Sequence, residues 1–162
     1  WGSADGYEDF GWENQSIFAI GYENLGYDFT WRVGYNYAKS PIEEFSTGPA
    51  FDENGFNYKN YKGSVLNYFN LAGFPALPEH HFTFGGGKRI NQHTSLDFAF
   101  VYSPQETRTF DTSALAQAQV ANMAGGRDMP AEVARELMNV TSSSSAKHSQ
   151  FSVSVGLNIK YY

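Results

Sequence analysis

Strict alternation between apolar and polar side chains is the feature that most restricts the fold of this chain. In residues 151–161 every odd position is apolar or aromatic, and every even position is small or polar. Successive side chains of a strand point to opposite faces, so this segment predicts a strand with one apolar face and one polar face. A surface helix would repeat its apolar residues every three to four positions instead.

The same alternation recurs along the chain. It is clear in residues 29–37 and 96–102, and weaker in residues 18–22 and 82–87. We therefore predict five strands, at residues 12–23, 27–39, 80–90, 94–103 and 149–161. Each is close to the ~9–11 residues that a tilted strand needs to cross a bilayer.

The connections between these strands alternate in length. Short turns at 24–26 and 90–93 alternate with long segments at 40–79 and 104–148. In an antiparallel meander the short turns then share one end of the sheet and the long loops share the other, as in bacterial outer-membrane barrels. Soluble domains seldom carry loops beyond ~12–15 residues. The predicted fold class is therefore all-β, an antiparallel transmembrane β-barrel of which this chain forms about five strands.

The second long loop shows helical periodicity. Ser113 is a suitable cap for a helix over 114–123, and a second helix is expected after Pro130. Each helix has an apolar stripe, formed by Ala116, Val120 and Met123 in the first and by Val133, Leu137 and Val140 in the second. We expect an extracellular helical hairpin whose Val120, Met123 and Leu137 contact a hydrophobic substrate. The first loop shows little regular period.

Composition excludes several classes of protein. The 162 residues amount to one domain, and the net charge of −6 offers nucleic acid no attractive field. The absence of cysteine excludes disulfides and thiolate sites, and no apolar run reaches the length of a membrane-spanning helix. Aromatic residues make up 17% of the chain, which argues against disorder.

Several motifs, in this order and spacing, resemble the C-terminal part of the FadL/TodX-type outer-membrane transporters of long-chain fatty acids and hydrocarbons. They are Gly11-Trp12-Glu13-Asn14-Gln15, Trp31-Arg32-Val33-Gly34-Tyr35-Asn36-Tyr37, Phe74-Pro75-Ala76, Glu79-His80-His81-Phe82-Thr83, Leu96-Asp97-Phe98-Ala99-Phe100-Val101-Tyr102 and Gly156-Leu157-Asn158-Ile159-Lys160-Tyr161. Residues 43–70 depart from the family as an insertion, and Tyr162 extends the aromatic end that resembles an assembly signal.

The resemblance implies a closed barrel plugged by an N-terminal hatch. The hatch and the remaining strands have no counterpart here, so we expect a missing segment or another chain to supply them. The implied function is passive uptake of hydrophobic small molecules, such as long-chain fatty acids or hydrocarbons, by a multi-pass protein of the bacterial outer membrane. Its other partners would be outer-membrane lipid and lipopolysaccharide. The alternatives are a secreted β-sandwich that binds carbohydrate and a surface adhesion or structural β-protein.

Candidate site residues lie on the polar face of the second strand. Arg32 and Asn36 share that face, and a guanidinium suits a fatty-acid carboxylate. The alternative role for Arg32 is an ion pair with Asp97 or Glu23. His80 and His81 point to opposite faces of a strand and cannot chelate one ion. We therefore expect no metal, and we find no motif that calls for a cofactor. Because the chain has no Cys and no Ser-His-Asp ordering with supporting turns, we also expect no enzymatic activity.

Overall fold

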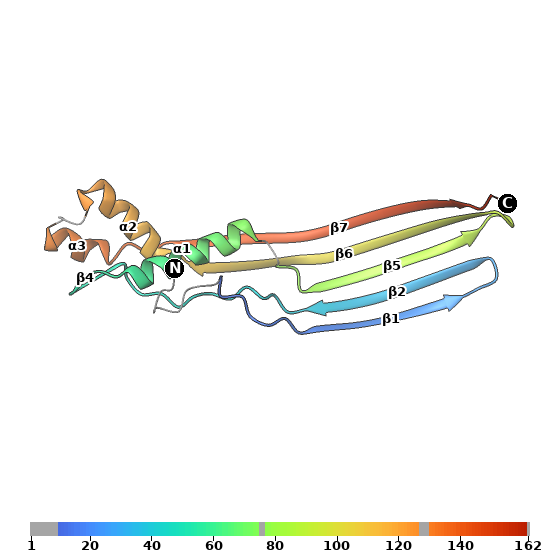
Figure 1. The fold of residues 1–162 in the computed structure, drawn as a ribbon, viewed down its shortest axis with the longest axis horizontal. Coiled ribbons are helices and arrows are strands. Elements are labelled where there is room, and N and C mark those ends of the chain that lie inside the picture. Colours follow the sequence, from blue (N-terminus) through green and yellow to red (C-terminus); the bar gives the residue numbers. More distant parts are fainter. Residues whose placement is uncertain (1–9, 75–76, 127–129, 162) are drawn as a thin grey trace. The chain divides into compact units, whose positions relative to one another are not determined.

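The computed structural model describes residues 10–74, 77–126 and 130–161. Within these residues the chain forms two compact units, drawn as a ribbon in Figure 1. We call them the sheet unit and the helical unit. The sheet unit comprises the described parts of Asn14–Ser40, Leu77–Glu106 and Lys147–Tyr162, and the helical unit those of Trp1–Glu13, Pro41–Ala76 and Thr107–Ala146.

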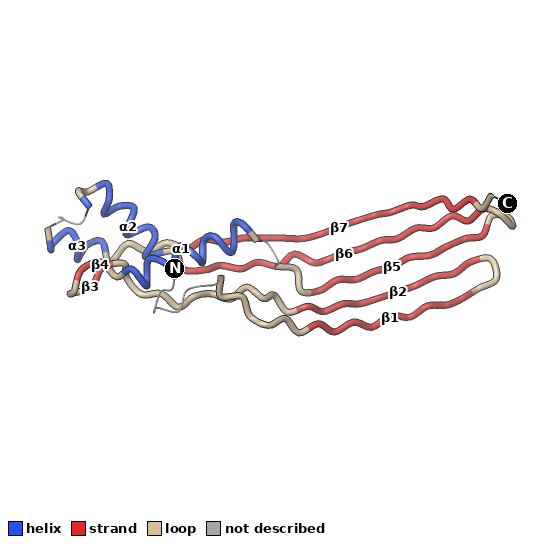
Figure 2. Tube along the Cα trace, in the orientation of Figure 1, coloured by secondary structure: helices blue, strands red, loops and turns tan. Residues whose placement is uncertain are grey.

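Five strands lie side by side in one layer (Figure 2). In their order across the sheet they are β1 (Ile17–Leu25), β2 (Phe29–Ala38), β5 (His80–Arg89), β6 (Thr94–Asp111) and β7 (Ser143–Ile159). The pairs β1–β2, β2–β5 and β5–β6 are antiparallel, which confirms an antiparallel β-protein with five principal strands. The sheet is not closed into a barrel, because β1 and β7 are its two edges.

The connections leave the sheet at alternate ends. Residues 26–28 join β1 to β2 and residues 90–93 join β5 to β6, both by short turns. In the second turn the Ile90 amide donates to the Thr94 carbonyl over 2.9 Å. The Lys160 amide donates to the His93 carbonyl over 2.8 Å, so the end of the chain lies beside this turn. The long connections leave from the other ends of the strands.

The first strand begins later than its sequence pattern predicts. The prediction starts it at residue 12, whereas β1 begins at Ile17. Trp12 instead forms an isolated bridge with Ile42, and its indole N–H donates to Asn70 Oδ1 over 3.3 Å. Both partners belong to the helical unit. A tertiary contact therefore removes this tryptophan from the sheet.

Two strands are longer than predicted. Strand β6 reaches Asp111 and β7 begins at Ser143, so the predicted loop 104–148 shrinks to residues 112–142. The predicted strand 94–103 stopped before Pro104, whereas β6 continues through it. The pairing of β5 with β6 already ends at Tyr102, so Pro104 has no partner on that side and its missing N–H breaks no ladder hydrogen bond there.

The helical unit contains three helices and a two-stranded hairpin among its described residues. These are α1 (Tyr58–Gly73), α2 (Ser113–Met123) and α3 (Ala131–Leu137), with β3 (Phe51–Asp52) paired to β4 (Gly55–Phe56). The predicted helices at 114–123 and after Pro130 correspond to α2 and α3. The prediction missed α1 altogether.

Helix α1 lacks an apolar stripe because its buried face is mostly polar. Gly63, Ser64, Asn67, Asn70 and Leu71 recur at helical spacing and are buried. Hydrophobic periodicity cannot detect such a helix, since the pattern it seeks consists of apolar residues. The helix is nevertheless capped at its start, where the Asn57 side chain accepts the Asn60 amide over 3.1 Å.

The side chain of Asn67 links α1 to two other backbone segments by hydrogen bonds. Its Oδ1 accepts the Phe45 amide over 2.8 Å, while its Nδ2 donates to the carbonyls of Phe45 and Asp111 over 3.0 Å each. The side chain has no exposed surface. This buried amide therefore has its hydrogen bonds satisfied, and it joins the segment at Phe45 to the end of β6 through α1.

Two further buried amides act in the same manner. Asn70 Nδ2 donates to the Phe10 carbonyl over 2.9 Å. Gln117 of α2 accepts the Ala50 amide over 2.7 Å and donates to the Val140 carbonyl over 2.9 Å. Gln117 is 2% exposed, so the segments before and after α2 are joined through one interior side chain.

The apolar core of the helical unit is small. It consists of Ala50, Phe51, Ala114, Ala118, Ala121 and Leu137, with Tyr61, Val133 and Val140 packed against it. Four of the six buried residues are alanines, which allow helix α2 to approach its neighbours closely. Buried amides and a small core together hold this unit.

We predict that Gln117→Leu weakens the helical unit. The substitution leaves the buried Ala50 amide without a partner, at a cost of about 1–3 kcal/mol, and also removes the hydrogen bond to the half-buried Val140 carbonyl. Hydrogen exchange followed by mass spectrometry should show loss of protection at Ala50. Gln119→Leu, on the exposed side of the same helix, is the matched control. Equal protection in both variants would contradict the role of Gln117.

Candidate functional site

The register of the sheet separates apolar from polar residues. Directly opposed residues of antiparallel strands lie on the same face. One such row runs through Tyr22, Val33, Phe84 and Phe100, and the ring of Phe151 on β7 meets Phe100 edge to face at 5.0 Å. Each of the five strands thus contributes an apolar or aromatic residue to one row. We call this side of the sheet the apolar face.

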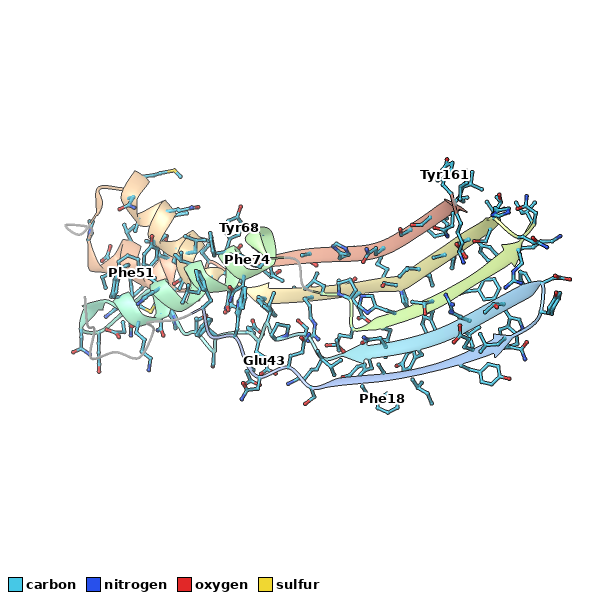
Figure 3. All side chains as sticks on the ribbon, turned by 45° about the vertical axis from the view of Figure 1, so that its right-hand side comes forward. Phe18, Glu43, Phe51, Tyr68, Phe74 and Tyr161 are labelled. Atoms are coloured by element: carbon cyan, nitrogen blue, oxygen red, sulfur yellow. The ribbon has the colours of Figure 1, made fainter. Side chains whose placement is uncertain are left out.

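Side chains of the apolar face are open to solvent. Val155 is 71% exposed and Phe151 is 66% exposed. Figure 3 labels Phe18, which projects from edge strand β1, and Tyr161, which follows β7 at the other edge. The members that expose 40% or more include Phe18, Ile20, Tyr22, Val33, Phe82, Phe84, Leu96, Tyr102, Phe151, Val153, Val155, Leu157 and Ile159.

The opposite face carries Arg32, the first of the predicted site residues. Its Nε lies 2.5 Å from Glu23 Oε1, directly across the β1–β2 pair. The next residues of that row are Gly85 and Ala99, which have small side chains. Of the two ion-pair partners considered from sequence, the structure selects Glu23. Asp97 instead accepts a hydrogen bond from the side chain of Asn158.

Asn36, the second predicted site residue, shares this polar face. It stands opposite Ala19 on β1 and His81 on β5. Its Oδ1 is buried and has no hydrogen-bond partner among the described residues. His80 pairs with Tyr37 on the apolar face, so the two neighbouring histidines do point to opposite sides.

Glycines 85–87 serve packing on both faces. The Phe98 ring lies over Gly86, where an added Cβ would stand 2.9 Å from the ring and from the Thr30 carbonyl oxygen. On the polar face, the Asp97 carboxylate lies over Gly87 in the same way. Close approach of a neighbouring side chain is therefore the physical reason for glycine at positions 86 and 87.

The helical unit contains an open groove of about 320 Å³. Aromatic side chains of the β3–β4 hairpin and α1 form one wall, and α2 forms the other. The aromatic wall consists of Phe51, Phe56, Tyr58 and Tyr61. Their rings contact one another, with centroids 5.4 Å apart for Phe51–Phe56 and 5.5 Å for Phe56–Tyr61. We call this feature the aromatic groove.

The three predicted loop residues do not come together at this groove. Val120 is 40% exposed and Met123 is 84% exposed, whereas Leu137 is buried in the core. The buried side of α2 is formed by Ala114, Gln117, Ala118 and Ala121. The predicted stripe of Ala116, Val120 and Met123 therefore does not form the buried side of α2, and contact of Val120 and Met123 with a substrate stays a prediction.

The groove residues were missed for a related reason. Phe56, Tyr58 and Tyr61 stand in a segment rich in aromatic and asparagine residues that shows no apolar period. The density of aromatic residues in this polar segment was the available signal. Asp52 also contributes locally, since its Oδ1 accepts the Asn54 amide over 2.8 Å and fixes the hairpin turn.

Comparison with protein-family models, curated proteins and solved structures finds no match to the chain. The resemblance drawn from sequence motifs therefore stays a hypothesis. Pro75, Ala76 and Tyr162, which belong to those motifs, lie outside the described residues.

Two further findings concern the described part of the chain. No cluster of three or more His, Asp or Glu side chains in it has a geometry that would hold a metal ion. None of its helices has the length and apolar character needed to cross a membrane.

We predict that Gly86→Ala destabilises the sheet by about 1–3 kcal/mol, because the new methyl group must displace the Phe98 ring or the neighbouring backbone. Gly21→Ala is the matched control, since its Cβ would have 3.6 Å of clearance from the nearest atom. Urea unfolding of both variants in detergent micelles measures the difference. Equal midpoints would show that close packing at Gly86 is unimportant.

Proposed function

We propose that this chain is part of a transmembrane β-barrel of the bacterial outer membrane that admits hydrophobic small molecules by passive diffusion. Its proposed substrates are hydrophobic molecules such as long-chain fatty acids or hydrocarbons. The uncovered apolar face is the observation that carries the proposal. Soluble monomers rarely expose a continuous apolar patch above a few hundred Å². In a barrel wall, such a face contacts lipid.

Strand length and the opposite face agree with this assignment. Strands β1, β2 and β5 have 9, 10 and 10 residues, which matches the ~9–11 needed by a tilted membrane strand. The polar face carries small residues with a few charged groups, as the lumen of a barrel does. Arg32 faces this side and, beside Glu23, is the candidate for orienting the polar end of a substrate.

The open edges indicate what the barrel still needs. Unpaired backbone groups are costly in lipid, so β1 and β7 require partner strands. Both edges run in the same direction in the antiparallel order (Figure 1), so further antiparallel strands must be odd in number. A ring of identical copies would instead join β7 to β1 in parallel. We therefore propose that the remaining strands, with a hatch to plug the lumen, come from another segment or chain.

In this proposal the long connections, which mostly belong to the helical unit, are on the extracellular side of the outer membrane. The two long connections leave the same end of the strands, opposite to the short turns. In outer-membrane barrels this end faces the exterior, where lipopolysaccharide and incoming substrate are met. The aromatic groove supplies an apolar surface there, of the kind that ligand sites favour.

A lipid-facing strand predicts unequal effects of one substitution on its two sides. Val155→Arg on the apolar face should reduce the stability of the inserted protein by roughly 2–4 kcal/mol near the midplane of the bilayer. Ser154→Arg, one residue away on the polar face, should cost much less. Refolding into lipid vesicles across a urea series provides the measurement. Equal costs would favour the soluble β-sandwich or adhesion alternatives.

Uptake itself is tested in cells that carry the protein in the outer membrane together with the segment or chain that completes its barrel. Radiolabelled oleate or toluene should enter faster than in cells with an empty vector, and an uncoupler of the proton gradient should leave the outer-membrane step unchanged. Fractionation of the same cells shows whether the protein is inserted. Inserted protein without faster entry of either compound would overturn the transport role.

A further inference from the structure

Both walls of the aromatic groove include residues of the buried core. Phe51 belongs to the buried core, together with Ala118 and Ala121 of the opposite wall. Ala50, the residue before Phe51, is held by the buried Gln117 side chain. Core packing therefore holds both walls in place, and the hydrogen bond between the Ala50 amide and Gln117 holds the residue next to Phe51.

The groove is lined by uncharged groups. Four aromatic rings and the apolar side chain of Leu115 are among its lining groups. The side-chain amides of Gln119 and Asn122 are exposed beside them, and each can both donate and accept a hydrogen bond. No lining residue among those described carries a charge. Against these described lining residues, an anionic ligand would lose water without gaining an ion pair.

The size of the groove limits the ligand. Its volume of about 320 Å³ is roughly twice that of the ~150 Å³ engineered apolar cavity that binds benzene. One or two fused rings fit this space. Flat rings also match the wall, because aromatic pairs prefer offset or edge-to-face contact at the centroid distances found between Phe51, Phe56 and Tyr61.

We propose that the aromatic groove binds an uncharged planar aromatic molecule of one or two rings that carries a hydroxyl group. The rings lie against the aromatic wall, and the hydroxyl group hydrogen-bonds to Gln119 or Asn122 of α2. The inference rests on the proposed function only for its biological setting, as a first binding site on an uptake route. Binding itself is a property of the helical unit.

Three related probes separate ring, hydroxyl and charge. The intact chain in amphipol at neutral pH is titrated with 2-naphthol, naphthalene and 2-naphthoate, and binding is followed by probe fluorescence. 2-Naphthol should bind about three- to tenfold more tightly than naphthalene, as expected for one hydrogen bond. It should also bind at least about tenfold more tightly than 2-naphthoate. Equal or tighter binding of 2-naphthoate would overturn the proposal.

Substitutions on α2 locate the site. Asn122→Trp fills the groove from an exposed position and should weaken 2-naphthol binding at least about tenfold. Val120→Trp adds the same ring to an exposed position of the same helix that does not line the groove, and should leave affinity within about twofold. Unchanged binding by Asn122→Trp, or equal loss in both variants, would overturn the assignment. Amide protection at Ala50 verifies that both variants fold.

The hydroxyl contact has its own test. Gln119→Leu combined with Asn122→Leu keeps an apolar groove, so naphthalene should still bind while the preference for 2-naphthol disappears. A retained preference would overturn the hydrogen bond.

The two proposals fail separately. A chain that inserts and speeds uptake, yet binds 2-naphthol independently of Asn122, overturns the groove assignment alone. A chain that binds 2-naphthol through Asn122, but in which Val155→Arg and Ser154→Arg have equal cost on refolding into lipid vesicles, overturns the barrel proposal alone.

Discussion

Backbone pairing in a single register is the constraint on which the sheet unit depends. Each row of opposed residues, such as Ile20, Tyr35, Phe82 and Tyr102, stays on one side across four strands. A slip of one residue in any pair would move that strand's apolar residues to the polar side. The two-sided character of the sheet, and with it every functional proposal for its faces, follows from this register.

The helical unit is held together in a different way. Loop segments of the chain meet there without regular pairing, and buried amides supply the hydrogen bonds that a sheet would make between strands. Asn67 binds the backbone of Phe45 and Asp111, and Gln117 binds that of Ala50 and Val140. Removing one such amide leaves several backbone groups unpaired, which makes these positions more sensitive than their polarity suggests. The groove wall at Phe51 depends on the same arrangement.

The sequence predicted those elements that have one face formed by apolar residues at regular spacing. Alternation identified five strands, and the pair Arg32 and Asn36 was correctly placed on the polar side. Prediction failed where polar side chains face inward. Helix α1 was missed because Asn67 and Asn70 occupy its buried face, and the buried side of α2 was not recognised because Gln117 faces the interior. Periodicity methods assume that buried residues are apolar, so a helix packed through amides escapes them.

The sequence by itself therefore determined the strands, their two faces and the alternating lengths of their connections, because these depend on local geometry with a period of two. Tertiary structure alone decided where Trp12 lies, which carboxylate pairs with Arg32 and which residues form the aromatic groove. The ion pair is settled by the register of neighbouring strands, and the other two by contacts between segments far apart in the chain, such as Trp12 with Asn70 or Ala50 with Gln117. A local sequence pattern does not identify which residues of other segments it will contact, so these contacts are seen only in the folded chain.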